Sequence, residues 1–197
     1  MAKDKDRVRM YSLNPSNGKI KQLQAKEDVI SDYSIANQAF EMVYFGLSAS
    51  NSQRLYTYNL KNDASSCLID LSKEILRDIT LGEVQDWNFV SAQGDTIYGR
   101  FYLPPHFDAT KKYPMIVNYY GGTTPTARVM ESRYPSHVYA GLGYIVYIIQ
   151  PSGATGFGQE FSARHVNAWG KLTADEIIEG TKKFCEEHPF VNTKKIG

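Results

Sequence analysis

The sequence has little cysteine, no long apolar run and almost no net charge, and each of these absences excludes a class of protein. Its two cysteines, Cys67 and Cys185, lie far apart, so we expect two small buried side chains rather than a disulfide scaffold. The longest strongly apolar run, residues 144–149, is far short of the ~20 residues of a membrane-spanning helix. A net charge of +1 favours neither nucleic acid nor an anionic membrane as partner.

The sequence also lacks a recognisable signal peptide and a complete set of catalytic residues. Residues 1–6 contain no apolar core, so we expect no signal peptide in this chain, and nothing indicates a cellular compartment. No Gly-x-Ser-x-Gly nucleophile motif occurs. The glycine-rich residues 153–158 lack the spacing of a phosphate-binding loop, so we expect a structural loop. The four histidines have no metal-ligand spacing, and we therefore expect neither a metal nor another cofactor.

The amino-acid composition is that of a globular protein, and its many tyrosines favour strands. Hydrophobic residues make up 42% of the chain and charged residues 22%. Fourteen tyrosines fit strands and aromatic-lined clefts better than a helix bundle.

Residues 1–80 consist of short alternating stretches separated by turn residues, which is typical of antiparallel strands. We expect strands at residues 8–13, 19–23, 40–45, 54–60 and 67–69. The first and the last pair form hairpins that resemble each other at an offset of about 45 residues, a spacing typical of four-stranded propeller blades. An ordinary antiparallel sheet is the alternative.

The pattern changes at residues 78–83, where we place the boundary between a first domain, residues 1–80, and a second domain, residues 81–197. The second domain alternates strands with helices, which predicts an α/β fold with a mostly parallel sheet. The expected strands are residues 84–90, 96–103, 115–117, 144–150 and one that begins at 194, and the expected helices are residues 135–143 and 173–187, with a helical turn at 161–166. Thr173 and Glu176 have the spacing of a capping box, and His188 is expected at the end of that helix.

The strand at residues 115–117 leads into Tyr119-Tyr120-Gly121-Gly122. The two glycines allow a sharp turn and a close approach of other groups. Open α/β sheets place their chemistry at the carboxyl ends of the strands. By strand alternation Tyr119 is expected in the core, which leaves the Tyr120 phenol as the candidate functional group. A tyrosine that only bridges a turn is the alternative.

Several weak motifs gain specificity because they occur in a fixed order. They are Gly94-Asp95 with Ile97 and Gly99, Tyr102-Leu103-Pro104, Lys112-Tyr113-Pro114, Tyr119-Tyr120-Gly121-Gly122, Gly153-Ala154-Thr155-Gly156-Phe157-Gly158, and Trp169-Gly170 with Asp175. Together they resemble the N-terminal half of the α/β-hydrolase domain of the prolyl oligopeptidase family of serine peptidases. The dipeptidyl peptidase IV and acylaminoacyl-peptidase branches of the family are the most similar. A β-propeller accompanies this domain in the family, so the resemblance implies that residues 8–70 correspond to its last blade or two.

The resemblance also implies a function. Full-length members are serine peptidases that cleave short peptides through an acyl-enzyme, and Tyr120 matches the tyrosine whose hydroxyl donates to the oxyanion. The family's catalytic serine, acid and histidine follow the position of Gly197, so we expect this chain to be a fragment that ends just before the nucleophile motif and is inactive alone.

One alternative is an interaction module built on the propeller strands. Another is a carboxylesterase, which the presence of propeller strands disfavours. The expected partners are short peptide substrates and not nucleic acid, and whether the parent protein forms a homo-oligomer is left open. The branch of the family, and hence dipeptidyl- or acylaminoacyl-peptidase specificity, is also left open.

Overall fold

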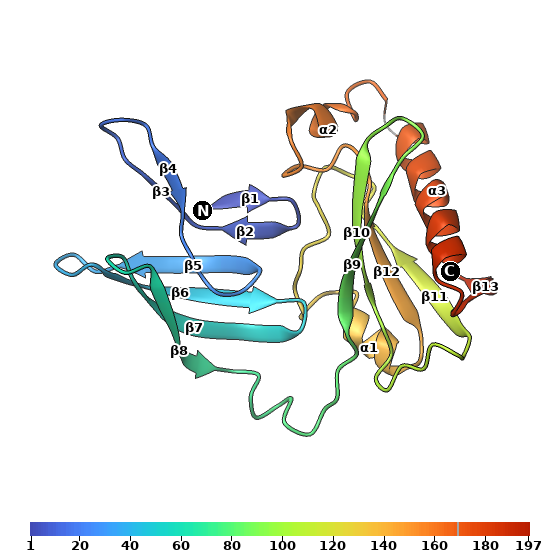
Figure 1. Ribbon diagram of the computed structural model, residues 1–197, viewed down its shortest axis with the longest axis horizontal. Helices are drawn as coiled ribbons and strands as arrows, with labels where there is room; N and C mark the ends of the chain where they lie inside the picture. Colours follow the sequence, from blue (N-terminus) through green and yellow to red (C-terminus); the bar gives the residue numbers. More distant parts are fainter. Residues whose placement is uncertain (169) are drawn as a thin grey trace. The chain divides into compact units, whose positions relative to one another are not determined.

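The computed structural model describes residues 1–168 and 170–197, which form two compact units (Figure 1). Unit 1 contains residues Met1–Ile79 and Ala127–Glu131, and unit 2 contains Thr80–Thr126 and Ser132–Gly197. The chain therefore leaves unit 2 after Thr126 and re-enters it at Ser132. Trp169, part of the motif series, lies outside the described residues.

Unit 1 is built on a six-stranded sheet in the order β1-β2-β5-β6-β7-β8. These strands are β1 (Ala2–Asp4), β2 (Arg7–Arg9), β5 (Val29–Ile35), β6 (Glu41–Ser48), β7 (Asn51–Asn59) and β8 (Ala64–Asp70). Strands β5 to β8 form an antiparallel meander. A separate hairpin joins β3 (Tyr11–Leu13) to β4 (Ile20–Gln22).

The core of unit 1 is made largely of tyrosines and methionines from one face of the meander. Its buried members are Met10, Ile30, Met42, Tyr44, Tyr56 and Tyr58. Tyr44 lies directly opposite Tyr56 on the neighbouring strand, and their rings stack with centroids 5.0 Å apart. Such cross-strand pairs stabilise a sheet, and they account for the alternation of buried and exposed residues along β6.

Three expectations for the first part of the chain need correction. The strand expected at residues 8–13 is interrupted at Met10, which is buried in the core and separates β2 from β3. Strand β5 was not expected, because a register shift between Ile30 and Asp32 disturbs its alternation. Cys67 is exposed rather than buried, while Cys185 is half-buried, and both thiols are free.

Unit 2 contains a five-stranded mixed sheet in the order β13-β11-β12-β10-β9. Its strands are β9 (Val84–Val90), β10 (Thr96–Tyr102), β11 (Tyr113–Asn118), β12 (Ile145–Gln150) and β13 (Val191–Ile196). β11 runs parallel to β12 and β13, whereas β9 and β10 form an antiparallel hairpin. All six residues of β12 are buried, as expected for a strand covered on both faces.

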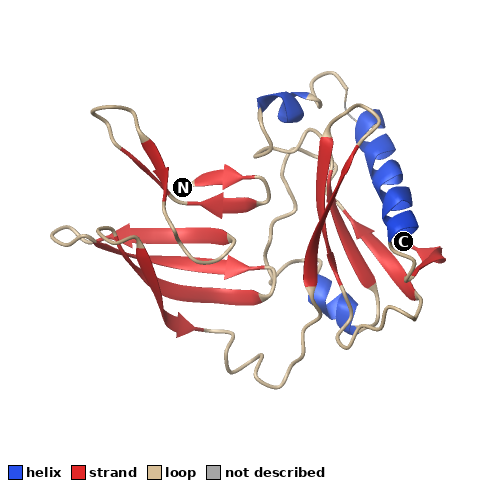
Figure 2. Ribbon diagram, viewed as in Figure 1, coloured by secondary structure: helices blue, strands red, loops and turns tan. Residues whose placement is uncertain are grey.

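In the described part of the chain all helices belong to unit 2 (Figure 2). They are α1 (Ser136–Gly141), α2 (Gln159–Ala163) and α3 (Lys171–Glu187). Phe184 of α3 packs edge-on against Phe101, while the next residue of β10, Tyr102, packs against His137 of α1. Because successive residues of a strand point to opposite faces, α1 and α3 cover opposite faces of the sheet. Among the described residues, no helix has the length and apolar character needed to cross a membrane.

The expected strands and helices of unit 2 are present, although β13 begins at Val191 rather than at residue 194. The sheet is mixed rather than mostly parallel, because β10 pairs antiparallel with both β9 and β12. The expected capping box is absent. Helix α3 begins at Lys171, and its N-cap residue Gly170 makes no side-chain cap. Thr173 and Glu176 are buried inside the helix instead. The end of the helix agrees with the sequence, since His188 is the C-cap and its Nδ1 lies 2.8 Å from the Phe184 carbonyl oxygen.

Candidate functional site

The tyrosine pair lies just beyond the end of β11, at the carboxyl edge of the sheet. Both side chains are exposed, Tyr119 by 49% and Tyr120 by 56%. The expectation that Tyr119 belongs to the core is therefore wrong, because β11 ends at Asn118 and strand alternation ends with it. Tyr119 instead lines an apolar hollow of about 340 Å³ together with Gly121 and the first turns of α3.

The Tyr120 ring lies against Gly122, and this contact explains the second glycine. A Cβ atom at Gly122 would lie 2.6 Å from Tyr120 Cε1, so close that the Tyr120 ring would have to move. Neither Gly121 nor Gly122 has a positive φ. The expectation of a close approach is thus confirmed at Gly122, and the glycine provides space rather than an unusual backbone angle.

The residues after the glycines are bound to the end of β12. The Gln150 side chain accepts a hydrogen bond from the Thr126 backbone N–H at 2.9 Å and donates one to the Thr126 carbonyl at 2.7 Å. Arg100 of β10 donates a further bond to the same carbonyl at 3.1 Å. Gln150 and Arg100 are 2% and 1% exposed, so these bonds are buried at their side-chain end.

The glycine-rich loop at residues 151–158 makes the next contact. Thr155 donates from both its backbone N–H, at 2.8 Å, and its hydroxyl, at 3.0 Å, to the Thr123 carbonyl. Gly153, Gly156 and Gly158 have positive φ angles, which favour glycine. At Gly153 space is also needed, since a Cβ there would overlap the His165 ring.

A buried carboxylate fixes the start of this loop. Glu176 of α3 is fully buried, and its Oε2 accepts a hydrogen bond from the Ser152 backbone N–H at 2.8 Å. Burial raises the pKa of Glu176, and the charge of Asp95 raises it further, while the Ser152 hydrogen bond and the charge of Arg164 lower it. Glu176 therefore binds the glycine-rich loop and does not cap the start of its own helix.

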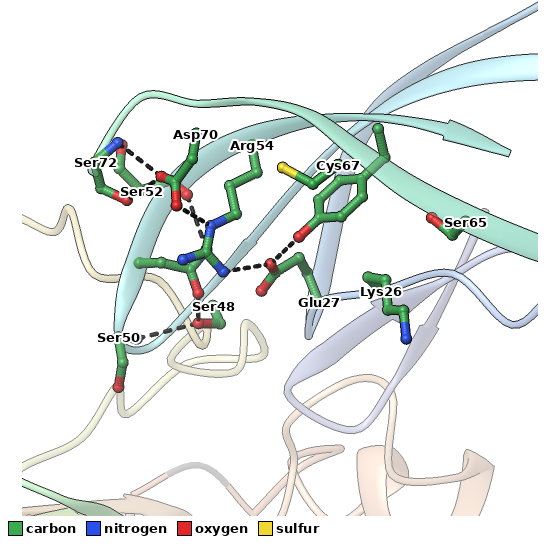
Figure 3. Close-up of polar contacts among 12 residues, drawn as sticks. Lys26, Glu27, Ser48, Ser50, Ser52, Arg54, Ser65, Cys67, Asp70 and Ser72 are labelled. Carbon is green, nitrogen blue, oxygen red and sulfur yellow. Dashed lines mark hydrogen bonds and ion pairs between the residues drawn. The ribbon is translucent and has the colours of Figure 1, made fainter. Parts of the chain in front are cut away.

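A second polar cluster lies in unit 1 and is satisfied internally (Figure 3). The Arg54 guanidinium lies between two carboxylates, with 2.9 Å contacts to Glu27 Oε1 and Asp70 Oδ2. Tyr56 donates to the same Glu27 oxygen at 2.5 Å. The pKa of Tyr56 is raised, first by burial and then by this carboxylate, so the phenol stays protonated. These contacts tie β7 to β8 and to the segment before β5, which is a structural role.

The histidines and carboxylates do not gather into a metal site. Across residues 1–168 and 170–197, no group of three or more His, Cys, Asp and Glu side chains is arranged to hold a metal ion. The candidate site is therefore the Tyr120 phenol, the glycine beneath it and the polar residues that hold its loop. Of these, the sequence patterns point to Tyr120 and Gly122. Thr155 belongs to a motif of the series but is given no role by it, and Gln150 and Arg100 belong to none of the motifs.

Comparisons with known proteins show a similarity to peptidases. The model of the prolyl oligopeptidase family matches residues 131–197. A probable dipeptidyl-peptidase 5 of Aspergillus terreus is 32% identical over 110 residues, which are 55% of this chain and 14% of that protein. A dipeptidyl-peptidase 5 of Porphyromonas gingivalis is 27% identical over 189 residues, 95% of this chain and 27% of that protein.

Solved structures show the same fold at lower sequence identity. The acylaminoacyl peptidase of Pyrococcus horikoshii superposes with a TM-score of 0.83 at 19% identity, over 98% of this chain and 30% of that one. Dipeptidyl peptidase 4 of Porphyromonas gingivalis gives 0.77 at 18% identity, over 95% and 27%. The expected fold class, part of an α/β-hydrolase domain preceded by propeller-like antiparallel strands, is confirmed. The chain spans between 14% and 30% of the length of these relatives.

Proposed function

We propose that the chain is part of a serine peptidase of the prolyl oligopeptidase family that hydrolyses short peptides, and that Tyr120 donates a hydrogen bond to the oxyanion. Dipeptidyl- and acylaminoacyl-peptidase activity are both compatible with the proposal, since relatives of both names are similar to the chain.

The chemistry of acyl transfer gives the phenol its role. When an activated serine attacks a peptide carbonyl, negative charge develops on the carbonyl oxygen as the tetrahedral intermediate forms. A donor fixed at that position stabilises the transition state more than the substrate, and losing one donor typically costs ~10²–10³ in kcat. The nucleophile belongs to the family's Gly-x-Ser-x-Gly motif, which does not occur within the 197 residues.

One observation supports Tyr120 above the other tyrosines of the sheet. Its phenol is exposed at the carboxyl end of a parallel strand, rests on Gly122, and stands on a loop that is bonded to β10, β12 and the glycine-rich loop. Tyr102 and Tyr147, by contrast, are buried in the sheet. A held but solvent-accessible O–H is what an oxyanion donor requires.

The test replaces Tyr120 by phenylalanine in the natural protein that contains these residues together with a Gly-x-Ser-x-Gly motif. We expect kcat for a chromogenic dipeptidyl or acylaminoacyl anilide to fall ~10²–10³-fold with little change in KM. Tyr119→Phe is the matched control, because it removes the neighbouring exposed hydroxyl, and it should leave kcat unchanged. A Tyr120→Phe enzyme with unaltered kcat would contradict the role of the phenol.

Two further assays separate the alternatives. The 197-residue chain alone should not turn over these anilides, because it contains no nucleophile motif; serine-dependent turnover by it would overturn that argument. A protein that cleaves aryl esters but no peptide anilide would be a carboxylesterase, contrary to the proposal.

A further inference from the structure

We propose that Gln150 and Thr155 are positioning residues for the reaction, which hold the Tyr120 loop, residues 119–126, so that the phenol meets the oxyanion. The inference rests on the proposed function, because it assigns Gln150 and Thr155 an effect only through Tyr120. The side chains of Gln150 and Thr155 bind backbone atoms of the Tyr120 loop, which lies more than 20 residues earlier in the sequence.

Gln150 forms hydrogen bonds with both backbone polar groups of Thr126, a residue of the Tyr120 loop. As the last residue of β12, it meets Thr126 with its carboxamide oxygen on the N–H and its carboxamide nitrogen on the carbonyl. The two bonds have the same donor and acceptor pattern as a hydrogen-bonded pair of residues on neighbouring strands. Together they fix the orientation of the Gln150 carboxamide. An apolar side chain of similar size at position 150 would leave the Thr126 N–H without this partner.

Arg100 extends the same attachment to a second strand. Its Nη1 donates to the Thr126 carbonyl, and its Nε lies 3.3 Å from the Tyr102 hydroxyl. The Thr126 carbonyl thus accepts two donors from neighbouring strands β10 and β12. The far end of the Tyr120 loop is therefore attached to the rigid centre of the sheet.

Thr155 fixes the middle of the Tyr120 loop. Its two bonds to the Thr123 carbonyl lie one residue beyond Gly122, on which the Tyr120 ring rests. Thr155 is itself held, because Glu176 binds Ser152 and the Phe161 carbonyl accepts from the Gly153 N–H at 2.8 Å. The loop is thus fixed at Asn118 by β11, at Thr123 by Thr155 and at Thr126 by Gln150.

Such attachments matter because oxyanion donors act by preorganisation. A misplacement of about 1 Å can cost ~10²-fold in rate, even when the change lies away from the reacting atoms. Released from its bonds, an exposed loop would carry the phenol through many positions, of which few stabilise the transition state. The loss should appear in kcat and not in KM.

The experiment compares Gln150→Leu and Thr155→Val in the natural peptidase, each with and without Tyr120→Phe. With Tyr120 present, we expect kcat to fall about 10–100-fold for Gln150→Leu and several-fold for Thr155→Val, with KM within about twofold. In the Tyr120→Phe background the same changes should lower kcat by less than about twofold, because the group they position is already gone. Thr155→Ser, which keeps the hydroxyl, should restore kcat.

Controls distinguish this inference from the proposed function and from misfolding. Thr181→Val removes a comparable hydroxyl bond, the one to the Ile177 carbonyl in α3, and should leave kcat unchanged. If Tyr120→Phe itself has no effect, the proposed function fails. If Tyr120→Phe lowers kcat but Gln150→Leu and Thr155→Val lower it by the same factor in both backgrounds, the positioning role alone is overturned. Thr155 is only partly buried, so the Thr155→Val result stands even if Gln150→Leu does not fold.

Discussion

At the scale of single residues, the two adjacent glycines after Tyr120 have different roles. The position of a Cβ at Gly122 is blocked by the Tyr120 ring, whereas a Cβ at Gly121 would meet no atom within 4 Å. Since neither residue has a positive φ, alanine is compatible with the backbone at both positions. Only the alanine at position 122 therefore disturbs the phenol.

This difference gives a prediction with a built-in control. Under the proposed function, Gly122→Ala should push the exposed Tyr120 ring aside and lower kcat of the natural protein that contains these residues about 10–100-fold, the range expected for a misplaced donor. Gly121→Ala should keep kcat within about twofold. Steady-state kinetics of the two variants, with thermal melting to verify folding, provide the measurement. Equal kcat values for the two alanine variants would mean that the contact with Gly122 does not place the phenol.

The sequence indicates Tyr120 but not the residues that hold it, for a physical reason. A phenol followed by two glycines at a strand end is a local pattern of four adjacent residues. Gln150 meets Thr126 across 24 positions, and the atoms it binds are backbone atoms that every residue has. What remains visible in the sequence is a polar residue that ends a strand of otherwise apolar side chains, and this alone does not identify a partner.

At the scale of elements, helix α3 shows how a local pattern can mislead. Thr173 and Glu176 have capping-box spacing, yet the Glu176 carboxylate turns to the Ser152 N–H in the glycine-rich loop. A buried N–H without an acceptor costs about 1–3 kcal/mol, more than a capping bond on an exposed helix end provides. The tertiary contact therefore overrides the local one, and the helix begins earlier than the pattern predicts.

Replacing Glu176 should separate its hydrogen bond from its charge. Glu176→Ala leaves the Ser152 N–H unpaired and should lower the free energy of unfolding by about 1–3 kcal/mol, whereas Glu176→Gln keeps an acceptor. Burial raises the pKa of Glu176 in the folded chain, so the folded state holds this proton more tightly than the unfolded state. The contribution of Glu176 to stability is then greatest below the unfolded pKa and falls as the pH rises through the folded pKa.

Urea denaturation of the wild-type chain and of Glu176→Gln, at about pH 4 and about pH 7, tests the sign of this effect. The stability of the glutamine variant relative to wild type should increase with pH. The charges near the group are Asp95, which raises its pKa, and Arg164, which lowers it, and both are present in the two proteins compared. A relative stability that decreases with pH would contradict a raised pKa.

At the scale of the whole molecule, the order of strands and helices in residues 84–197 follows from the sequence, because continuous apolar runs bounded by turn residues indicate buried strands and apolar residues at helical spacing indicate amphipathic helices. The short strands of unit 1 were located less well. Strand β5 contains a bulge, and β2 and β3 are three residues each, too short to display a period. No local sequence pattern indicates that residues 127–131 belong to unit 1, so this return of the chain was not predicted.

That returning segment contains a buried ion pair. Arg128 Nε lies 2.8 Å from Asp6 Oδ2, and the two side chains are 9% and 8% exposed. Asp6→Ala should lower the free energy of unfolding by about 3–5 kcal/mol, because it leaves the arginine charge buried without its carboxylate. The double variant Asp6→Ala/Arg128→Met should recover much of this loss. Urea denaturation followed by circular dichroism measures both, and additive losses would show that the pair does not interact.

The return of residues 127–131 also limits how the gene can be recombined. A chimera joined at residue 79 or 80 would take Asp6 from one parent and Arg128 from the other, although both side chains belong to unit 1. Exchanging unit 2 between related peptidases therefore requires three crossover points rather than one, so that the short segment stays with the strands on which it folds. The same ion pair makes the effect of a substitution at position 6 depend on the residue at position 128, although more than a hundred residues separate the two in the sequence.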